Sequence, residues 1–335
     1  SFMLNSSSLI YLDASHNDFG GSLAAHLGHV VNPRVSVIFL CDVGLESDSL
    51  AVDFQMDSLR ALSLCDNSLR SSELHNETSD WPSKLPKLEL LDLSGNDISG
   101  SIPSSWSGIV DMFSLNLADT GLTGSVGDNL AGLKTLQLVE LKLAGNQLTG
   151  ALPDPWSGPQ VVNLDVSRNS ITGSAPGFLG NSYLRSINFA HNQISGPLPL
   201  EWTFLSYLEE VVASGNVLSG TVIPQDFTKL TSLRTLDLSY GIPTASSVPP
   251  LTFFTKLTTL ENLNLAGLGY DTELDANWQD ALLNLRSLNL SMNDITGGWP
   301  YGASSGTGFP SLEVLDLSGN PSFNPYINDL VDRLV

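Results

Sequence analysis

The sequence predicts an α/β repeat solenoid in which each repeat contributes one short strand. The pattern LxxLxLxxN, in which x is any residue, recurs thirteen times. Most copies lead into a turn in which Gly precedes an apolar residue and Pro, as at Gly100, Ile102 and Pro103. Repeats of this length are typical of solenoids, because one unit cannot bury its apolar residues until its neighbours stack on it. We therefore expect about 13 stacked rungs.

Each rung is expected to begin with a short strand. Leucines alternate with polar residues, as at Leu91 and Leu93, and this alternation predicts a half-buried strand with its leucines facing the core. A recurrent Asn follows the strand. Its amide is expected to hydrogen-bond the backbone of the turn and of the next rung. The aligned positions, 23 to 29 residues apart, are Asn17, Val43, Asn67, Asn96, Thr120, Asn146, Asn169, Asn192, Asn216, Gly241, Leu268, Asn293 and Asn320.

The turn segments at 98–103, 148–153, 171–176 and 194–199 share the pattern LxGxIP, with small departures. They resemble the plant-type leucine-rich repeat family, which includes extracellular receptor ectodomains, and they are also similar to protist surface antigens. The resemblance covers nearly the whole chain. It implies a parallel sheet on the concave face and a convex side of 3₁₀ turns and irregular segments. It also implies an additional short strand after the main strand of many rungs.

The repeats predict a single leucine-rich repeat domain over residues 1–335. Irregular insertions are expected at 70–85, 241–250 and 297–309, where the period breaks, and such surface loops often carry function. The last segment, about 324–335, has apolar residues at helical spacing and is expected to form a helix that caps the final rung.

Composition favours an extracellular or cell-surface protein. The chain has 335 residues and a net charge of −21, from 14 basic and 35 acidic residues, which argues against binding nucleic acid or anionic membranes. No run of 18 apolar residues occurs, so no membrane span is expected within the chain. The chain begins at Ser1 without a signal peptide, so we interpret it as a mature or trimmed piece of a protein.

Three Asn-X-Ser/Thr triplets begin at Asn5, Asn76 and Asn289 and predict a glycoprotein. Asn76 is the preferred site because it lies in the longest segment between rungs, which is expected to bulge as a surface loop. Asn289 lies at an outward strand position, where a glycan would cover the concave face. The alternative is that all three are unmodified.

Cys41 and Cys65 occupy equivalent positions on adjacent rungs. Parallel strands lie about 4.8 Å apart, which places the two Cα atoms at the short end of the range for disulfides. A strained disulfide and a pair of small buried thiols both fit. We prefer the thiols, because small residues fill this position in other rungs.

The tryptophans are interpreted as core residues. Trp106, Trp156 and Trp202 share a register position that Phe or Leu fills elsewhere, which favours burial on the convex side over stacking against sugars. The remaining three, Trp81, Trp278 and Trp299, fall outside this register, and each is a candidate for partial exposure.

No catalytic activity, cofactor or metal site is expected. The five histidines are scattered, and the chain has no Gly-x-Ser-x-Gly elbow, P-loop or HExxH motif. The Asp that recurs at the outward strand position belongs to a common LDLS pattern and is interpreted as a solvated residue.

Binding residues are expected on the concave face, where most outward positions are Ser, Asn, Asp or Glu. Arg168, Arg185 and His191 are the preferred cluster, because Arg and aromatic residues are enriched in interfaces. In the alternative, Arg185 pairs with Glu209, and Arg234 pairs with Glu210 or Glu261. The full set of candidates is Phe39, Phe113, Lys142, Arg168, Arg185, His191, Arg234, Tyr240 and Met292.

These observations predict a receptor-like, non-catalytic recognition or adhesion module that binds a protein or peptide. The second interpretation is a structural subunit of a cell-surface or extracellular assembly, made of identical or different chains. The third is a cell-wall carbohydrate binder or an inhibitor.

Overall fold

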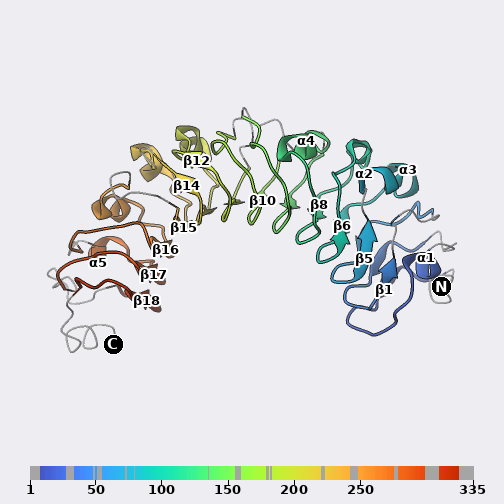
Figure 1. The fold of residues 1–335 in the computed structure, drawn as a ribbon, viewed down its shortest axis with the longest axis horizontal. Coiled ribbons are helices and arrows are strands. Elements are labelled where there is room, and N and C mark those ends of the chain that lie inside the picture. The colour runs from blue at the N-terminus through green and yellow to red at the C-terminus, as the bar shows by residue number, and fades with distance from the viewer. Residues whose placement is uncertain are drawn as a thin grey trace. The chain divides into compact units, whose positions relative to one another are not determined.

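The chain divides into two compact units, an N-terminal unit (Ser1–Ile171) and a C-terminal unit (Thr172–Val335). Both contain the same repeat (Figure 1). The assignment of one domain to the whole chain stays an expectation. The computed structural model describes residues 8–27, 34–47, 50, 55–71, 74–78, 80–134, 136–154, 160–178, 181, 183–219, 223–241, 248–274, 278–298 and 309–323.

Thirteen strands form a parallel sheet whose order follows the chain, which confirms the predicted solenoid class and its repeat number. Each strand has three residues. Those of the N-terminal unit are β1 (Tyr11–Asp13), β2 (Val37–Phe39), β4 (Ala61–Ser63), β6 (Leu90–Asp92), β8 (Ser114–Asn116), β9 (Glu140–Lys142) and β10 (Asn163–Asp165). Those of the C-terminal unit are β11 (Ser186–Asn188), β13 (Glu210–Val212), β15 (Thr235–Asp237), β16 (Asn262–Asn264), β17 (Ser287–Asn289) and β18 (Val314–Asp316).

The central residue of each strand faces the core. Leu62, Leu91 and Leu115 are in register on β4, β6 and β8 and are at most 1% exposed. Leu236 and Leu263 repeat this arrangement in the C-terminal unit. Burying one such side chain contributes about 1.5–3 kcal/mol. Stacking of these leucines therefore drives the fold, as the alternating pattern predicts.

The recurrent Asn forms a ladder of hydrogen bonds between rungs. Asn96 Nδ2 donates to the carbonyl oxygens of Leu64 (3.0 Å) and Leu93 (2.9 Å), and its Oδ1 accepts the backbone N–H of Leu69 (3.1 Å). Leu64 and Leu69 belong to the preceding rung, so the predicted partner, the next rung, was wrong. The same bond to the preceding rung is made by Asn67, Asn146, Asn169, Asn216, Asn293 and Asn320.

The residue before each aligned position has a positive φ angle in all thirteen rungs. Gly adopts this left-handed conformation without strain, whereas other residues lose about 1–2 kcal/mol each. We call these positions the left-handed row. It comprises His16, Asp42, Asp66, Gly95, Asp119, Gly145, Arg168, His191, Gly215, Tyr240, Gly267, Met292 and Gly319.

Short helices connect the rungs on the other side of the sheet, which confirms the 3₁₀ turns implied by the resemblance. The α-helices are α1 (Leu23–Leu27), α2 (Leu74–Glu77), α3 (Trp81–Lys84), α4 (Val126–Ala131) and α5 (Trp278–Ala281). The 3₁₀ helices are η1 (Ser104–Gly108), η2 (Leu200–Phe204), η3 (Gln225–Lys229) and η5 (Leu251–Lys256).

Tryptophan side chains fill the space beneath these helices. Trp106 and Trp202 are fully buried, as predicted. Trp81 and Trp278 are 1% exposed, so the interpretation of these two as candidates for partial exposure was wrong. Trp81 lies off the register yet stacks on Trp106, with ring centroids 5.9 Å apart. Trp156 and Trp299 lie outside the described residues.

Additional short strands follow some of the main strands. β3 (Glu46–Ser47), β5 (Ser68–Ser71) and β7 (Asp97–Ile98) form a second parallel sheet in the N-terminal unit. β12 (Ser195–Gly196) pairs with β14 (Val217–Leu218) in the C-terminal unit. These pairs confirm the additional strand that the resemblance implied.

The segment 70–85 is not the irregular surface loop that its length predicted. Its described part contains the end of β5 and the helices α2 and α3, and it buries Leu74, Trp81 and Leu85 completely or nearly so. The extra residues thus add helix and core. The interiors of the insertions at 241–250 and 297–309, and the expected capping helix at about 324–335, lie outside the described residues.

Candidate functional site

The residue immediately before each main strand faces outward, and we call these positions the pre-strand row. In the N-terminal unit the row ends in three apolar residues on successive rungs, Phe113, Val139 and Val162. The N–H groups of Val139 and Val162 donate to the carbonyls of Phe113 (2.7 Å) and Val139 (3.0 Å), which fixes their adjacency. Phe113 is 42% exposed and Val139 is 45% exposed. We call these three residues the apolar segment.

In the C-terminal unit the same row carries only charges, which alternate in sign. Arg185 pairs with Glu209 (2.6 Å) and Arg286 with Glu313 (3.0 Å). Arg234 pairs with Glu261 and not with Glu210, which instead accepts a hydrogen bond from Ser186. The charged segment, in rung order, is Arg185, Glu209, Arg234, Glu261, Arg286 and Glu313.

A hollow of about 740 Å³ lies on the outward face near the start of the sheet. Its lining combines the carboxylates of Asp13, Asp66 and Asp92 with the ring of Phe39. The Tyr11 ring meets the Phe39 ring edge to face at 5.9 Å. The hollow therefore offers an aromatic wall beside several carboxylates.

The two cysteines also line this hollow, and they form a disulfide. Their Cα atoms are 4.5 Å apart, at the short end of the range, as the strand spacing implies. The preference for a pair of buried thiols was therefore wrong. Cys41 and Cys65 are also only half-buried, because their position faces the outward edge of the strand end.

The recurrent strand Asp has a structural task beyond solvation. Asp92 and Asp237 each accept the backbone N–H of the Ser two residues later, at 3.0 Å and 2.9 Å. The corresponding bond from Ser15 lowers the pKa of Asp13, and that from Ser318 lowers the pKa of Asp316. These carboxylates cap the strand ends, which is their role in the fold.

Several predicted binding residues belong to the left-handed row. Arg168 Nη2 donates to both carboxylate oxygens of Asp119 (2.9 and 3.1 Å), and this pair spans Gly145 of the intervening rung. A Cβ atom added at Gly215 would lie 2.5 Å from the His191 ring, so that ring covers Gly215. Tyr240 covers Gly267 and Met292 covers Gly319 in the same way, and both remain more than half exposed.

The other predicted residues lie on the strands or immediately before them. Phe39 and Phe113 face outward in the N-terminal unit, and Lys142 pairs with Glu140 on its own strand (2.8 Å). Of the preferred cluster, Arg168 lies in the N-terminal unit, whereas Arg185 and His191 lie in the C-terminal unit. The cluster stays a prediction, and its two arginines have carboxylate partners.

Two of the three predicted glycosylation sites are described. Asn76 is exposed on α2. Asn289 is half-buried on β17, and its Oδ1 accepts hydrogen bonds from the Ser291 backbone (2.9 Å) and hydroxyl (2.7 Å). Asn5 lies outside the described residues. Glycosylation stays a prediction at all three.

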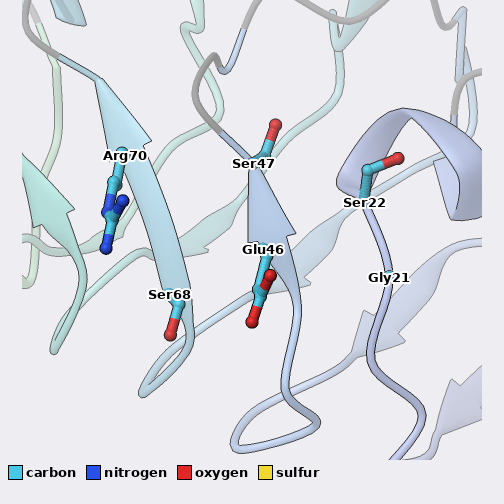
Figure 2. A pocket seen from close by; sticks show the side chains of 6 residues that line it. All are labelled: Gly21, Ser22, Glu46, Ser47, Ser68 and Arg70. Atoms are coloured by element: carbon cyan, nitrogen blue, oxygen red, sulfur yellow. The ribbon is translucent and has the colours of Figure 1, made fainter.

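A second hollow, of about 530 Å³, lies over the short strands of the N-terminal unit. Figure 2 shows Glu46 on β3 and Ser68 and Arg70 on β5, with Ser22 on the neighbouring segment. Arg70 lies 3.9 Å from the Asp97 carboxylate. Hydroxyl, carboxylate and guanidinium groups suit a polar ligand, but none of the lining residues is an aromatic platform for a sugar ring.

Within the described residues, no group of three His, Cys, Asp or Glu side chains is arranged to hold a metal ion. No helix among them has the length and apolar character needed to cross a membrane.

Sequence reasoning missed the contrast between the apolar and charged segments. It examined the departures from Ser, Asn and Asp one residue at a time. The signal was present, because reading the residue before each strand along successive rungs shows the strict alternation of Arg and Glu.

The chain is similar to known repeat proteins. A Leucine Rich Repeat model matches residues 87–109, and a second matches residues 180–197 and 281–298. Receptor-like protein 39 from Arabidopsis thaliana is 32% identical over 126 residues, which is 38% of this chain and 11% of that protein.

Solved structures of plant receptors have a similar fold. The ectodomain of the plant membrane receptor kinase GASSHO1/SCHENGEN3 from Arabidopsis thaliana has a TM-score of 0.76 and 25% identity, over 95% of this chain and 36% of that one. The PEPR1–AtPEP1 structure gives 0.74 and 26%, over 96% and 43%. The chain thus spans less than half the length of these relatives. Its fold is a leucine-rich repeat solenoid, and its repeats are similar to those of plant receptor ectodomains.

Proposed function

We propose that the chain is a non-catalytic, extracellular or cell-surface module that binds a protein or peptide through the outward sheet face of its N-terminal unit. The observation that carries this proposal is the exposure of apolar side chains on that face. Ile10 and Tyr11 are 57% and 54% exposed, and Phe113 and Val139 are 42% and 45% exposed. Apolar groups gathered on an exposed surface mark interaction sites.

The chemistry of this face favours an extended peptide that carries apolar and basic side chains. The apolar segment offers successive apolar contacts about 4.8 Å apart along the sheet. The hollow lined by Asp13, Asp66 and Asp92 offers carboxylates to a Lys or Arg side chain. A rigid sheet loses little conformational freedom when it binds, so contacts on it contribute efficiently to affinity.

The relatives support this proposal. Two of them are described as a membrane receptor kinase ectodomain and a receptor-like protein, which favours an extracellular or cell-surface location. The GASSHO1/SCHENGEN3 ectodomain was solved in complex with CASPARIAN STRIP INTEGRITY FACTOR 2.

The test is selection of binders from a displayed library of random peptides, followed by affinity measurements on variants. The double variant Phe113→Ser/Val139→Ser should weaken the selected peptides at least about tenfold. The matched control is Val110→Ser, which removes a 66% exposed valine from a turn outside the sheet and should leave affinity unchanged. Failure to enrich any peptide, or equal losses in both variants, would refute the proposal.

Of the predicted cluster, Arg185 and His191 of the C-terminal unit form a second proposed contact surface. Replacing both with Ser should weaken partner binding at least about tenfold while the melting temperature changes little, because exposed ion pairs add little stability. Unchanged affinity would remove these two residues from the binding surface.

A structural subunit of an extracellular or cell-surface assembly is the second candidate function. The charged segment favours it, because a long regular row of charges suits a fixed contact with another chain. Light scattering of the purified protein separates the candidates: a recognition module has the mass of one chain or of a two-chain dimer, whereas a structural subunit has the mass of a fixed larger assembly.

A further inference from the structure

We propose that the charged segment is a docking edge for a second copy of this chain, related to the first by a two-fold axis. Its six residues lie on six successive rungs at one register position and alternate strictly in sign. A two-fold axis perpendicular to the row reverses the order of the rungs in the second copy. The row begins with Arg and ends with Glu, so the reversed copy begins with Glu where the first begins with Arg. Every charge then faces its opposite.

The pairing can be stated residue by residue. With the axis between the rungs of Arg234 and Glu261, Arg234 of one copy faces Glu261 of the other. On the rungs outside these, Glu209 faces Arg286 and Arg185 faces Glu313. An unreversed copy in the same register would place Arg opposite Arg, and one shifted by a rung would leave an unpaired charge at each end. Only the reversed arrangement therefore pairs all six charges, and two-fold symmetry is the usual geometry of closed dimers.

All six charged side chains keep part of their surface exposed, including Glu209, Glu261 and Glu313 at 38%, 28% and 64%. The Arg185, Arg234 and Arg286 side chains are 51%, 61% and 59% exposed despite their internal partners. A guanidinium group has five N–H donors, so an internal carboxylate leaves donors for a carboxylate of the other copy.

Exposed apolar residues beside the row would also lie opposite one another across the proposed axis. Tyr207, 50% exposed, precedes Glu209 by two residues and carries Arg185 over its ring at 5.8 Å. Leu283, 51% exposed, precedes Arg286 by three residues. The axis that places Glu209 opposite Arg286 also brings the Tyr207 flank of one copy toward the Leu283 flank of the other. Apolar contact there would add to the complementary charges.

The experiment reverses one internal pair at a time. The variant Arg185→Glu/Glu209→Arg keeps an internal ion pair but places Glu opposite Glu313 and Arg opposite Arg286 in the dimer. The variant Arg286→Glu/Glu313→Arg produces the same two clashes from the other end of the row. Sedimentation equilibrium of each variant alone should give a dissociation constant at least about tenfold above that of the native chain.

Mixing the two variants is the decisive measurement. In a mixed dimer every position again faces its opposite, so the equimolar mixture should dimerise within about threefold of the native affinity, and raised salt should weaken both. Circular dichroism and melting temperature of each variant check that folding is intact. The proposal is overturned if the native chain stays monomeric at high concentration, if either variant dimerises like the native chain, or if mixing restores nothing.

Discussion

The N-terminal and C-terminal units use one backbone register to present two different surfaces. Before their strands, the N-terminal unit carries one Arg–Glu pair, Arg60 and Glu89, and then the apolar Phe113, Val139 and Val162. The C-terminal unit alternates Arg and Glu over all six rungs. The inward leucines are equally buried in both units. The core therefore sets the spacing of the rungs and leaves the chemistry of the outward face open. A solenoid of identical rungs can in this way carry two separate kinds of contact.

The largest expected effect tests whether the cores of the two units are equivalent. Leu141→Ala in the N-terminal unit and Leu236→Ala in the C-terminal unit each remove a fully buried side chain. Each should lower the free energy of unfolding by about 2–5 kcal/mol, through lost burial and the cavity left behind. Urea denaturation followed by circular dichroism measures this. A loss in only one unit would show that the cores differ.

The Asn ladder should give the next largest effect. Asn146 donates to three carbonyls and accepts three backbone N–H groups, including that of Leu122 at 2.9 Å. Asn146→Ala should cost about 1–3 kcal/mol, because these buried groups lose their partner. The exposed neighbour Gln147→Ala is the control and should have little effect. Equal stability of the two variants in thermal denaturation would contradict the ladder's role.

Exchanging the outward rows sharpens the comparison directly. Phe113→Arg/Val139→Glu gives the N-terminal unit the charge pattern of Arg185 and Glu209. Stability should change by no more than about 0.5 kcal/mol, because these positions face solvent, while binding of the selected peptides should be lost. Melting temperature and peptide titration separate the two effects. A large loss of stability would mean that the apolar segment belongs to the core.

The smallest effect is a pH dependence at the strand caps. The hydrogen bond from Ser318 lowers the pKa of Asp316 below its ordinary value of 3.8. This carboxylate therefore stabilises the fold above that pH and loses its contribution as pH falls through the lower folded pKa. Asp316→Asn should flatten this dependence, because Asn289 fills the same position in the preceding rung. The free energy of unfolding of the native chain and of Asp316→Asn is measured as the pH is lowered. If the two curves coincide, this carboxylate does not contribute to the pH dependence of stability.

Glycines, leucines and the recurrent Asn allowed the fold to be predicted from sequence. Their spacing reports the rung length, and thirteen copies exclude coincidence. The prediction failed where a segment breaks the repeat period but still packs against the core. The segment 70–85 broke the period, yet it folds into helices that bury Leu74 and Trp81. Whether a segment loops out or packs in depends on the space beside it, which periodicity does not report.

For the candidate site, the sequence by itself determined which residues face outward, because strand alternation fixes the face. Only the tertiary structure decided what each residue touches. It joined Cys41 to Cys65 and paired Arg168 with Asp119 across Gly145. Such contacts connect residues 24 and 49 positions apart in the chain. They form because stacking brings the side chains of different rungs within a few ångströms of one another. The sequence alone does not give these distances, because they depend on how the rungs stack in space.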